Sequence, residues 1–421
     1  MSFFISKVKA YEILDSRGNP TVEVKIFDDK GNVGEASVPS GASTGKYEAL
    51  ELRDGDENRF FGKGVLKACE NITNIIEPCI LNCIVDSTLL ERKILSLDKS
   101  ENKSELGANA ILAVSLALRR LEAKEQNKEL FELFNGEKII PVPMMNILNG
   151  GVHASNNLDI QEFMILPVGF DSFSLALRGC SEVYQKLKEI LKELGLNTNV
   201  GDEGGFAPSL ENDDEALDLI VKAIEKSGYI PGKHFLISLD VAASEWKGKS
   251  VGEYYLPKRK IKMNNNELVN YYERLISDYP IYSIEDGLDE EDYSGWKEMT
   301  NRINQISLVG DDLFVTNKKR LEYGIVNKIA NSILIKYNQI GSLSETLDTI
   351  NLAKKSSYSF IISHRSGETG DTFISDLAVG CGAKLIKAGA PARYERVAKY
   401  NRLLEIETDY DLPYAGRIIC K

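Results

Sequence analysis

The stretch SILIKYNQIG, residues 332–341, joins a strand pattern to a charged residue at its end. Residues 333–335 are an uninterrupted apolar run, as expected of a strand that is covered on both faces. Lys336 follows directly, and the residues after it have the composition of a turn. Capping of the strand end, with the ammonium extended to water, explains a lone lysine in this place. The rest of the chain repeats the pattern, which favours another explanation.

Eight short apolar runs follow one another from Val142 onward, and amphipathic segments of helical period separate most of them. They are VPMMNIL (142–148), EFMILPV (162–168), FLISLDV (235–241), IYSIEDGL (281–288), SLVGDDLF (307–314), SILIKYN (332–338), SFIISHR (359–365) and AKLIKAG (383–389). Eight strands with helical connections predict a closed β/α barrel, with an open doubly wound sheet as the alternative. The first two strands are joined without a helix and are followed by two helical segments, so we expect the barrel to begin irregularly.

The first part of the chain has strands before helices. Residues 8–16 and 20–39 alternate in period two around the turn DDKGN, and residues 64–82 and 107–126 have helical patterns. This order predicts an α+β unit. We therefore expect two domains, an N-terminal α+β domain over residues 1–135 and a C-terminal barrel over residues 136–421.

The composition, 43% hydrophobic and 27% charged residues in a chain of 421, is typical of a soluble globular protein. A formal net charge of −12 argues against general affinity for nucleic acid or anionic membranes. The sequence has neither a signal-peptide h-region nor an apolar stretch long enough to span a membrane. Its six cysteines form no CxxC pair, so we interpret them as reduced and mostly buried thiols. We therefore expect a cytoplasmic enzyme.

Charged residues interrupt six of the eight apolar runs at their carboxyl ends. They are Asp240, Glu285, Asp311, Lys336, the pair His364 and Arg365, and Lys387. In a barrel these ends converge on one face, where active sites of this architecture lie. Three carboxylates without cysteine make an all-oxygen site suited to Mg²⁺ or Mn²⁺, unless they only pair with nearby basic residues. A bound cation and Lys387 would lower the pKa of Lys336 and make its amine available as a base.

Two glycine-rich loops add polar candidates. NVGDEGGFAP, residues 199–208, carries Asp202 and Glu203, and a carboxyl there could be a general acid, although the loop could equally be only a turn. VPSGASTGKYE, residues 38–48, is one residue short of a P-loop and lacks Ser or Thr after its lysine. We reject nucleotide binding there and favour a mobile lid.

Of the three histidines, His153 and His364 fall in polar glycine-rich loops, whereas His234 precedes a strand and is interpreted as structural. The pair Arg365–Ser366 is well suited to a phosphate. Taken singly, each of these residues is better explained as scaffold than as part of a site.

Ten motifs, in order along almost the whole chain, carry a resemblance to a known family. They are DSRGNPTVEV, VPSGASTG, LNGGVHASNN, QEFMILP, VGDEGGFAP, SIEDGLDEEDYSGW, VGDDLFVTN, KYNQIGSLSET, SHRSGETGDTFISDLAVG and IKAGAPAR. In these motifs the chain resembles the enolases, the glycolytic phosphopyruvate hydratases, and we expect the bacterial type. The resemblance implies an N-terminal α+β domain and a barrel that begins ββαα. It also implies a lyase that reversibly dehydrates 2-phosphoglycerate to phosphoenolpyruvate with two Mg²⁺ ions.

The resemblance also implies a role for each site residue. Asp240, Glu285 and Asp311 would hold the tighter Mg²⁺, and Ser43 would bind a second once substrate is present. Lys336 would remove the C2 proton, and Glu203 would be the acid that helps the C3 hydroxyl to leave. Lys387 would hold the substrate carboxylate, Arg365 and Ser366 the phosphate, and the pocket would be lined by His153, Gln161, Glu162 and His364. Gly370 and Ala388 depart from the family's usual residues, at positions with no assigned chemistry.

Other roles stay open at this stage. A racemase or cycloisomerase of the same superfamily would share the metal carboxylates, but Ser43 and the Arg365–Ser366 pair argue against it because those substrates lack a phosphate. The resemblance also implies a homo-oligomer, either a dimer or an octamer. Secondary roles at the cell surface after non-classical export, with plasminogen captured by Lys421, or in an RNA-degrading assembly would be additional.

Overall fold

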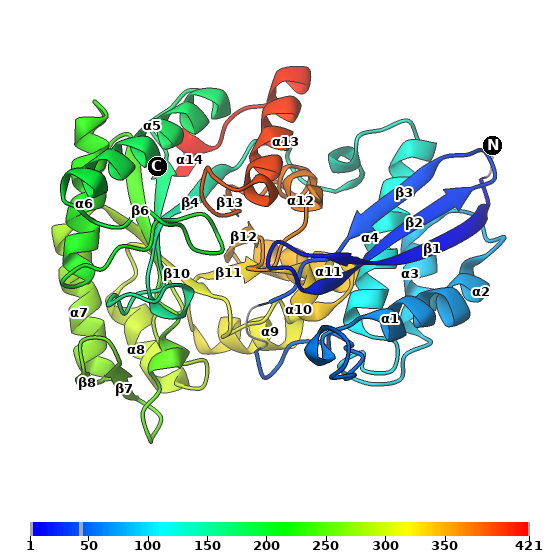
Figure 1. Ribbon diagram of the computed structural model, residues 1–421, viewed down its shortest axis with the longest axis horizontal. Helices are drawn as coiled ribbons and strands as arrows, with labels where there is room; N and C mark the ends of the chain where they lie inside the picture. Colours follow the sequence, from blue (N-terminus) through cyan, green and yellow to red (C-terminus); the bar gives the residue numbers. More distant parts are fainter. Residues whose placement is uncertain (1–2, 42–44, 420–421) are drawn as a thin grey trace.

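The N-terminal part of the chain folds around a three-stranded sheet, drawn in blue in Figure 1. The computed structural model describes residues 3–41 and 45–419. β1 (Ile5–Leu14), β2 (Pro20–Asp28) and β3 (Val33–Ser37) form an antiparallel sheet in that order. The residues of β2 alternate between buried and half-buried positions, which is the period-two pattern of the sequence. The predicted turn joins β2 to β3, and Asp28 accepts hydrogen bonds from two backbone N–H groups within it.

One long helix, α4 (Ala108–Glu125), covers this sheet (Figure 1). The two elements are so close at Gly34 that a Cβ there would lie 2.1 Å from the carbonyl oxygen of Ala117. Shorter elements complete the unit: η1 (Phe60–Gly62), α1 (Leu66–Asn71), η2 (Ile72–Ile76), α2 (Glu77–Ile80), α3 (Ser87–Leu95) and η3 (Leu130–Leu133). The sequence predicted the α1–α2 region and α4 but not α3.

The C-terminal part is a closed barrel, as predicted, with strands in the order β10-β11-β12-β13-β4-β5-β6-β9. The strands are β4 (Val142–Asn149), β5 (Glu162–Pro167), β6 (Phe235–Asp240), β9 (Ile281–Glu285), β10 (Ser307–Gly310), β11 (Ser332–Ile335), β12 (Ser359–Ser363) and β13 (Leu385–Lys387). All eight coincide with the apolar runs of the sequence, and only β4 extends beyond its run, by one residue. Closure of the ring excludes the open doubly wound sheet.

The barrel begins irregularly, and this start determines what lies at its mouth. β4 and β5 are joined through the short turn η4 (Gly151–His153), and two helices, α5 (Phe173–Glu193) and α6 (Asp213–Lys226), follow β5. β5 pairs antiparallel with both of its neighbours, β4 and β6. The amino end of β5 therefore lies at the same edge as the carboxyl ends of the other strands.

Helices alternate with the remaining strands and cover the barrel (Figure 1). They are α7 (Asn265–Asp278), α8 (Tyr293–Arg302), α9 (Lys318–Asn327), α10 (Tyr337–Ile340), α11 (Leu343–Lys355), α12 (Phe373–Cys381), α13 (Tyr394–Tyr410) and α14 (Gly416–Ile419). The turn η5 (Ala243–Trp246) and the hairpin of β7 (Glu253–Leu256) and β8 (Ile261–Asn264) are inserted after β6.

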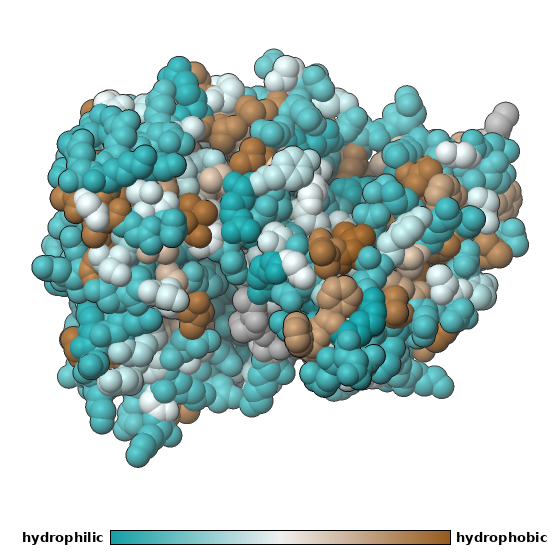
Figure 2. Space-filling view, in the orientation of Figure 1, coloured by the Kyte–Doolittle hydropathy of each residue, from teal (hydrophilic) through white to brown (hydrophobic). Residues whose placement is uncertain are grey.

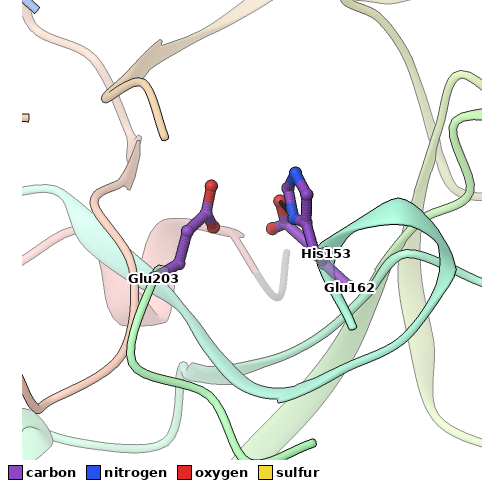
Figure 3. Close-up of side chains that lie close together, drawn as sticks. All are labelled: His153, Glu162 and Glu203. Carbon is purple, nitrogen blue, oxygen red and sulfur yellow. Dashed lines mark ion pairs between the residues drawn. The ribbon is translucent and has the colours of Figure 1, made fainter. Parts of the chain in front are cut away.

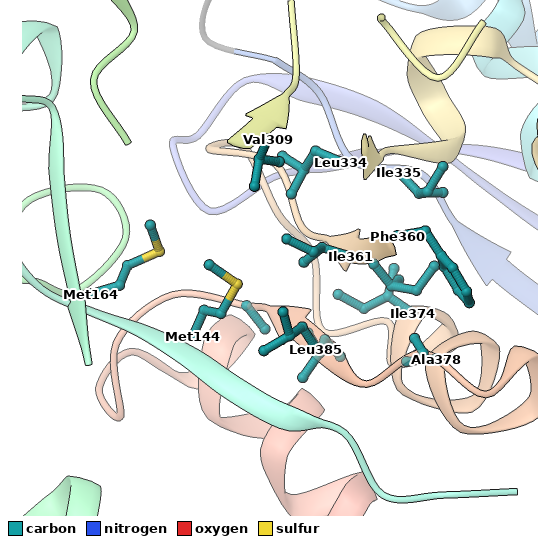
Figure 4. Close-up of a cluster of buried hydrophobic side chains, with 14 of the residues drawn as sticks. Met144, Met164, Val309, Leu334, Ile335, Phe360, Ile361, Ile374, Ala378 and Leu385 are labelled. Atoms are coloured by element: carbon teal, nitrogen blue, oxygen red, sulfur yellow. The ribbon is translucent and has the colours of Figure 1, made fainter. Parts of the chain in front are cut away.

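The core fills the barrel and the layer between strands and helices. Figure 4 shows Met144, Met164 and Leu334 within the ring of strands, and Ile374 of α12 beside the strand residue Phe360. The first three of these side chains are fully buried. Burial of a side chain of this size stabilises the fold by about 1.5–3 kcal/mol.

Several contacts between the two parts of the chain lie at the loop after β12. Ser40 and Gly367 exchange backbone hydrogen bonds, and Arg120 of α4 pairs with Asp371 through two bonds of 2.6 and 2.8 Å. The N-terminal unit thus contacts the edge of the barrel at which the charged strand ends lie. The domain boundary near residue 135 stays a prediction.

The surface and the thiols agree with the sequence analysis. The face seen in Figure 2 is mostly hydrophilic, with hydrophobic residues in small scattered groups. In the described part of the chain no helix is long and apolar enough to cross a membrane. The five cysteines within residues 3–41 and 45–419 are free thiols, three of them buried.

Candidate active site

A cavity of about 400 Å³ lies where the charged strand ends converge. Nine carboxylates border it: Glu48, Glu162, Asp202, Glu203, Asp240, Glu245, Asp286, Asp311 and Asp312. Three basic side chains, Lys336, Arg365 and Lys387, face them. Of the predicted site residues, all but two border this cavity. Glu285 is fully buried beneath it, and Ser43 lies outside the described residues.

Lys387, at the end of β13, joins three of the carboxylates. Its Nζ donates to Oδ2 of Asp240 at 2.8 Å and to Oε1 of Glu285 at 3.0 Å. It also lies 3.3 Å from Oε2 of Glu162. Burial disfavours the ammonium, but the attraction of Asp240 and the other carboxylates outweighs it and holds the pKa of Lys387 well above its usual value. Lys387 is therefore a permanent positive charge at the base of the cavity.

Lys336 follows β11 and pairs with Asp311, which follows β10. The other oxygen of Asp311 accepts a hydrogen bond of 2.8 Å from Gln339. Burial disfavours the charged form of Lys336, but Asp311 outweighs it, so the pKa of the lysine lies above its usual value. The predicted fall in this pKa concerns the metal-bound enzyme and stays a prediction.

The acidic residues form two groups that could hold a metal ion. Within residues 3–41 and 45–419, ligand atoms of Asp286, Asp311 and Asp312 lie within 4.8 Å of one another, as do those of His153, Glu162 and Glu203. The predicted set of Asp240, Glu285 and Asp311 comes from three adjacent strands, and Lys387 lies between the first two.

The donor chemistry at these strand ends fits a hard divalent cation. Burial and the Asp311 charge raise the pKa of Asp312 to about 7, so a cation bound beside this carboxyl would favour its ionised form. All-oxygen donors in excess of basic groups are the surroundings that Mg²⁺ prefers. The individual ligands remain predictions.

Glu162 and Glu203 form a carboxyl pair on another side of the cavity. Figure 3 shows Glu203 facing Glu162 and His153 from a separate loop. Nδ1 of His153 lies 3.4 Å from Oε1 of Glu162. Burial, reinforced by the Glu203 charge, raises the pKa of Glu162 well above its usual value. Burial opposes the ionisation of Glu203 too, but His364 and the other basic groups outweigh it and hold the pKa of Glu203 well below its usual value. Because two like charges this close are unfavourable, Glu162 is the member of the pair that favours the protonated form.

Glu203 is tied to its surroundings through one oxygen. Its Oε2 accepts a hydrogen bond from Nδ2 of Asn146 at 3.2 Å and lies 3.4 Å from Nε2 of His364. The glycines of its loop permit close packing, since a Cβ at Gly205 would lie 2.1 Å from Oδ1 of Asn149. The loop is thus a packed element that directs Glu203 into the cavity.

Arg365 is held by the N-terminal part of the chain. NH1 and NH2 each lie 3.1 Å from an oxygen of Glu48, and NH1 also donates to Asn338 at 3.1 Å. Arg365 and Ser366 both border the cavity, as expected for a pair that would bind an anion. Residue 48 belongs to the predicted lid segment, so this segment reaches the site.

Gln161 and Asp202 border the cavity as predicted, and Nε2 of Gln161 lies 3.4 Å from Oδ2 of Asp240. His234 is structural, as expected, and its Nδ1 accepts a hydrogen bond from the backbone of Ile230 at 2.9 Å. Ala388 is fully buried behind Lys387, and Gly370 has only Tyr394 near the position of a Cβ.

Sequence reasoning did not assign six polar residues found at or directly behind the site: Glu48, Asn146, Glu245, Asp286, Asp312 and Arg396. Asp286 was visible as the second acid of SIED, and Glu48 ends the quoted lid motif. Asn146 lies inside a strand and Arg396 inside a helix, where nothing in the local pattern distinguishes them. Only the fold places them beside the loops of the site.

Comparison with protein-family models gives two matches. The model described as "Enolase, N-terminal domain" matches residues 5–134, and the model described as "Enolase, C-terminal TIM barrel domain" matches residues 137–421. Together they cover almost the whole chain.

Proposed function

The chain belongs to the enolase family of lyase-type, metal-dependent enzymes, and from this premise we propose that it reversibly dehydrates 2-phospho-D-glycerate to phosphoenolpyruvate with Mg²⁺. The observation that carries the proposal is the position of a lysine and a carboxyl pair around one cavity. β11 and β5 are four places apart in the ring of eight strands, so Lys336 and Glu162 approach from opposite sides.

This arrangement suits an elimination across two adjacent carbons. A base on one side removes the proton at C2, and an acid on the other side protonates the hydroxyl that leaves from C3. We assign Lys336 as the base. Glu203 is the acid, and the proton that it donates to the hydroxyl comes from the Glu162–Glu203 pair.

The hard step is proton removal next to a carboxylate, because it places a second negative charge on that group. Lys387 is buried and permanently charged, so it is suited to bind the substrate carboxylate and stabilise that charge. Mg²⁺ held by Asp240, Glu285 and Asp311, with a second ion at Ser43, would supply further positive charge to the same oxygens. Arg365 and Ser366 would bind the phosphate, while His153, Gln161 and His364 complete the pocket.

The proposal is tested by the appearance of phosphoenolpyruvate absorbance from 2-phosphoglycerate with saturating Mg²⁺. We expect turnover by the wild type, loss of turnover on chelation and its return when Mg²⁺ is restored. A silent wild type that still binds Mg²⁺ would contradict the proposal and favour a sister reaction without a phosphate.

We also propose that the protein is a cytoplasmic enzyme and that it works as a homo-oligomer, as the family resemblance implies. Surface export, plasminogen capture through Lys421 and membership of an RNA-degrading assembly stay predictions, and Lys421 lies outside the described residues.

A further inference from the structure

Arg396 is a fully buried arginine of α13 that lies behind the site and does not border the cavity. Its guanidinium donates to four acceptors at the back of the catalytic loops. NH1 donates to the carbonyl oxygen of Arg365 at 2.6 Å and lies 2.6 Å from Nδ1 of His364. NH2 donates to the carbonyl oxygens of Asp202 at 3.1 Å and Ser366 at 2.5 Å. One side chain thus joins the loops that carry the acid and the anion-binding pair.

The chemistry of the arginine decides the protonation of His364. A guanidinium has N–H donors only and stays protonated, so Nδ1 of His364 must accept. In the neutral ring the proton is then on Nε2, the nitrogen that lies 3.4 Å from Oε2 of Glu203. The imidazole therefore faces the acid with a donor.

We infer that Arg396 is a positioning residue that fixes the Nε2-protonated tautomer of His364, so that His364 presents a donor to Glu203 and no free acceptor to the proton of the Glu162–Glu203 pair. This inference rests on the proposed function, in which that proton is delivered to the leaving hydroxyl. A histidine free to accept at Nε2 would compete for the proton.

The other charged groups around His364 do not reverse the effect of Arg396 on its protonation. Burial lowers the pKa of His364 to about 4, and Arg396 acts in the same direction, while Glu203 and Glu368 oppose them. The backbone N–H of His364 donates to the carbonyl oxygen of Lys387. The ring is thus held between a fixed cation behind and an acceptor in front.

The tautomer can be measured directly, because the chain has only three histidines. Protein with ¹⁵N-labelled histidine gives three ring spin systems in a long-range ¹H–¹⁵N spectrum, which the variants His234→Gln and His364→Asn assign. We expect the neutral ring of His364 to be protonated on Nε2 only. A neutral ring protonated on Nδ1, or a mixture of the two tautomers, would overturn the inference.

Variants at Arg396 test the positioning role. In Arg396→Met we expect a mixed tautomer and a fall in kcat of about 100-fold with little change in KM. Arg396→Lys retains a donor to Nδ1 and should restore the single tautomer. Arg402→Met is the matched control, because Arg402 lies on the same helix but pairs with Asp376 and Glu129 away from the site. In Arg402→Met the tautomer of His364 and kcat should equal those of the wild type.

An unchanged tautomer and kcat in Arg396→Met would overturn the inference. If that variant fails to fold, the wild-type spectrum still decides, because it needs neither variant nor substrate. An Nε2-protonated His364 in a protein without turnover on 2-phosphoglycerate would contradict the proposed function alone.

Discussion

The two ends of the barrel carry hollows of similar size and opposite chemistry. The cavity at the carboxyl ends of the strands has about 400 Å³ and nine carboxylates. The hollow at the amino ends has about 540 Å³, and the described residues that line it are all neutral, among them Ser307, Ser332 and Ser359. Since the same strands run between the two ends, the difference lies in which residue ends each strand. The residues at the amino ends are suited to packing, whereas those at the carboxyl ends include more acidic than basic groups.

Neutral groups at the amino ends satisfy one another. The hydroxyls of Ser307 and Ser332 lie 2.6 Å apart, and Oγ of Ser332 lies 3.0 Å from Oδ1 of Asn331. At the carboxyl end, by contrast, burial and then the charge of a neighbouring acid raise the pKa values of Asp312 and Glu162. Such groups would destabilise a site that bound nothing, so we interpret the charged end as built around a cation and an anionic substrate.

The largest difference in kcat between substitutions at the two ends is expected from Lys336→Ala. Loss of the base should lower kcat by about 10³-fold or more, while the fold persists. Ser332→Ala, at the other end of the same strand, is the matched control and should keep the wild-type kcat. Steady-state assays of both variants decide, and equal kcat values for the two would contradict the division between the ends.

Metal binding sharpens the comparison, because only the charged end should take a cation. A divalent ion present at 100 times its dissociation constant should stabilise the protein by about 2.7 kcal/mol. Asp240→Asn should weaken this effect, whereas Ser332→Ala should retain it in full. Thermal unfolding with Mg²⁺ and with chelator measures the shift. An equal shift in Asp240→Asn and wild type would place the ion elsewhere.

The ion pair of Asp371 with Arg120 is a structural contact near the charged end of the barrel, and its contribution to stability can be tested. Burial opposes the ionisation of Asp371, but Arg120 outweighs it and keeps the pKa of Asp371 below its usual value. The pair therefore contributes stability above the unfolded pKa of about 3.9, and this contribution is lost as pH falls through the lower folded pKa. Asp371→Asn should be destabilised relative to wild type by about 2 kcal/mol at pH 7.

That difference should shrink in acid, as urea midpoints at pH 7 and pH 3 would show. A gap between wild type and Asp371→Asn that does not narrow at pH 3 would show that the ion pair is not its source.

The smallest effect is expected at the neutral end. Ser332→Ala removes one member of a hydroxyl pair and should cost about 1 kcal/mol of unfolding free energy. Urea denaturation measures this cost. A loss of several kcal/mol would mean that the serines at this end support the barrel more than the packing argument allows.

Much of the fold followed from the sequence, because barrel strands covered on both faces read as continuous apolar runs. All eight were visible, and so were the charged residues at their carboxyl ends. The direction of β5 was not, because an apolar run reads the same in either direction. Glu162 starts its strand, so the rule of carboxyl ends could not find it, and only the family resemblance named it.

The remaining parts of the site depend on contacts between residues far apart in the chain. Glu48 pairs with Arg365 across 317 positions, and Arg396 contacts Asp202 across 194. No local period or motif encodes such a contact. The prediction of the metal set has the same limit, because no pattern in the sequence indicates that Lys387 lies between Asp240 and Glu285.

The central claim is that a base and an acid act from opposite sides of one cavity. It is tested most directly by exchange of the C2 hydrogen of 2-phosphoglycerate with deuterated water, measured beside dehydration. Lys336→Ala should lose exchange and dehydration together, whereas Glu203→Gln should lose dehydration by about 100-fold and still exchange the C2 hydrogen. Exchange that persists in Lys336→Ala, or that disappears in Glu203→Gln at unchanged binding, would contradict the account.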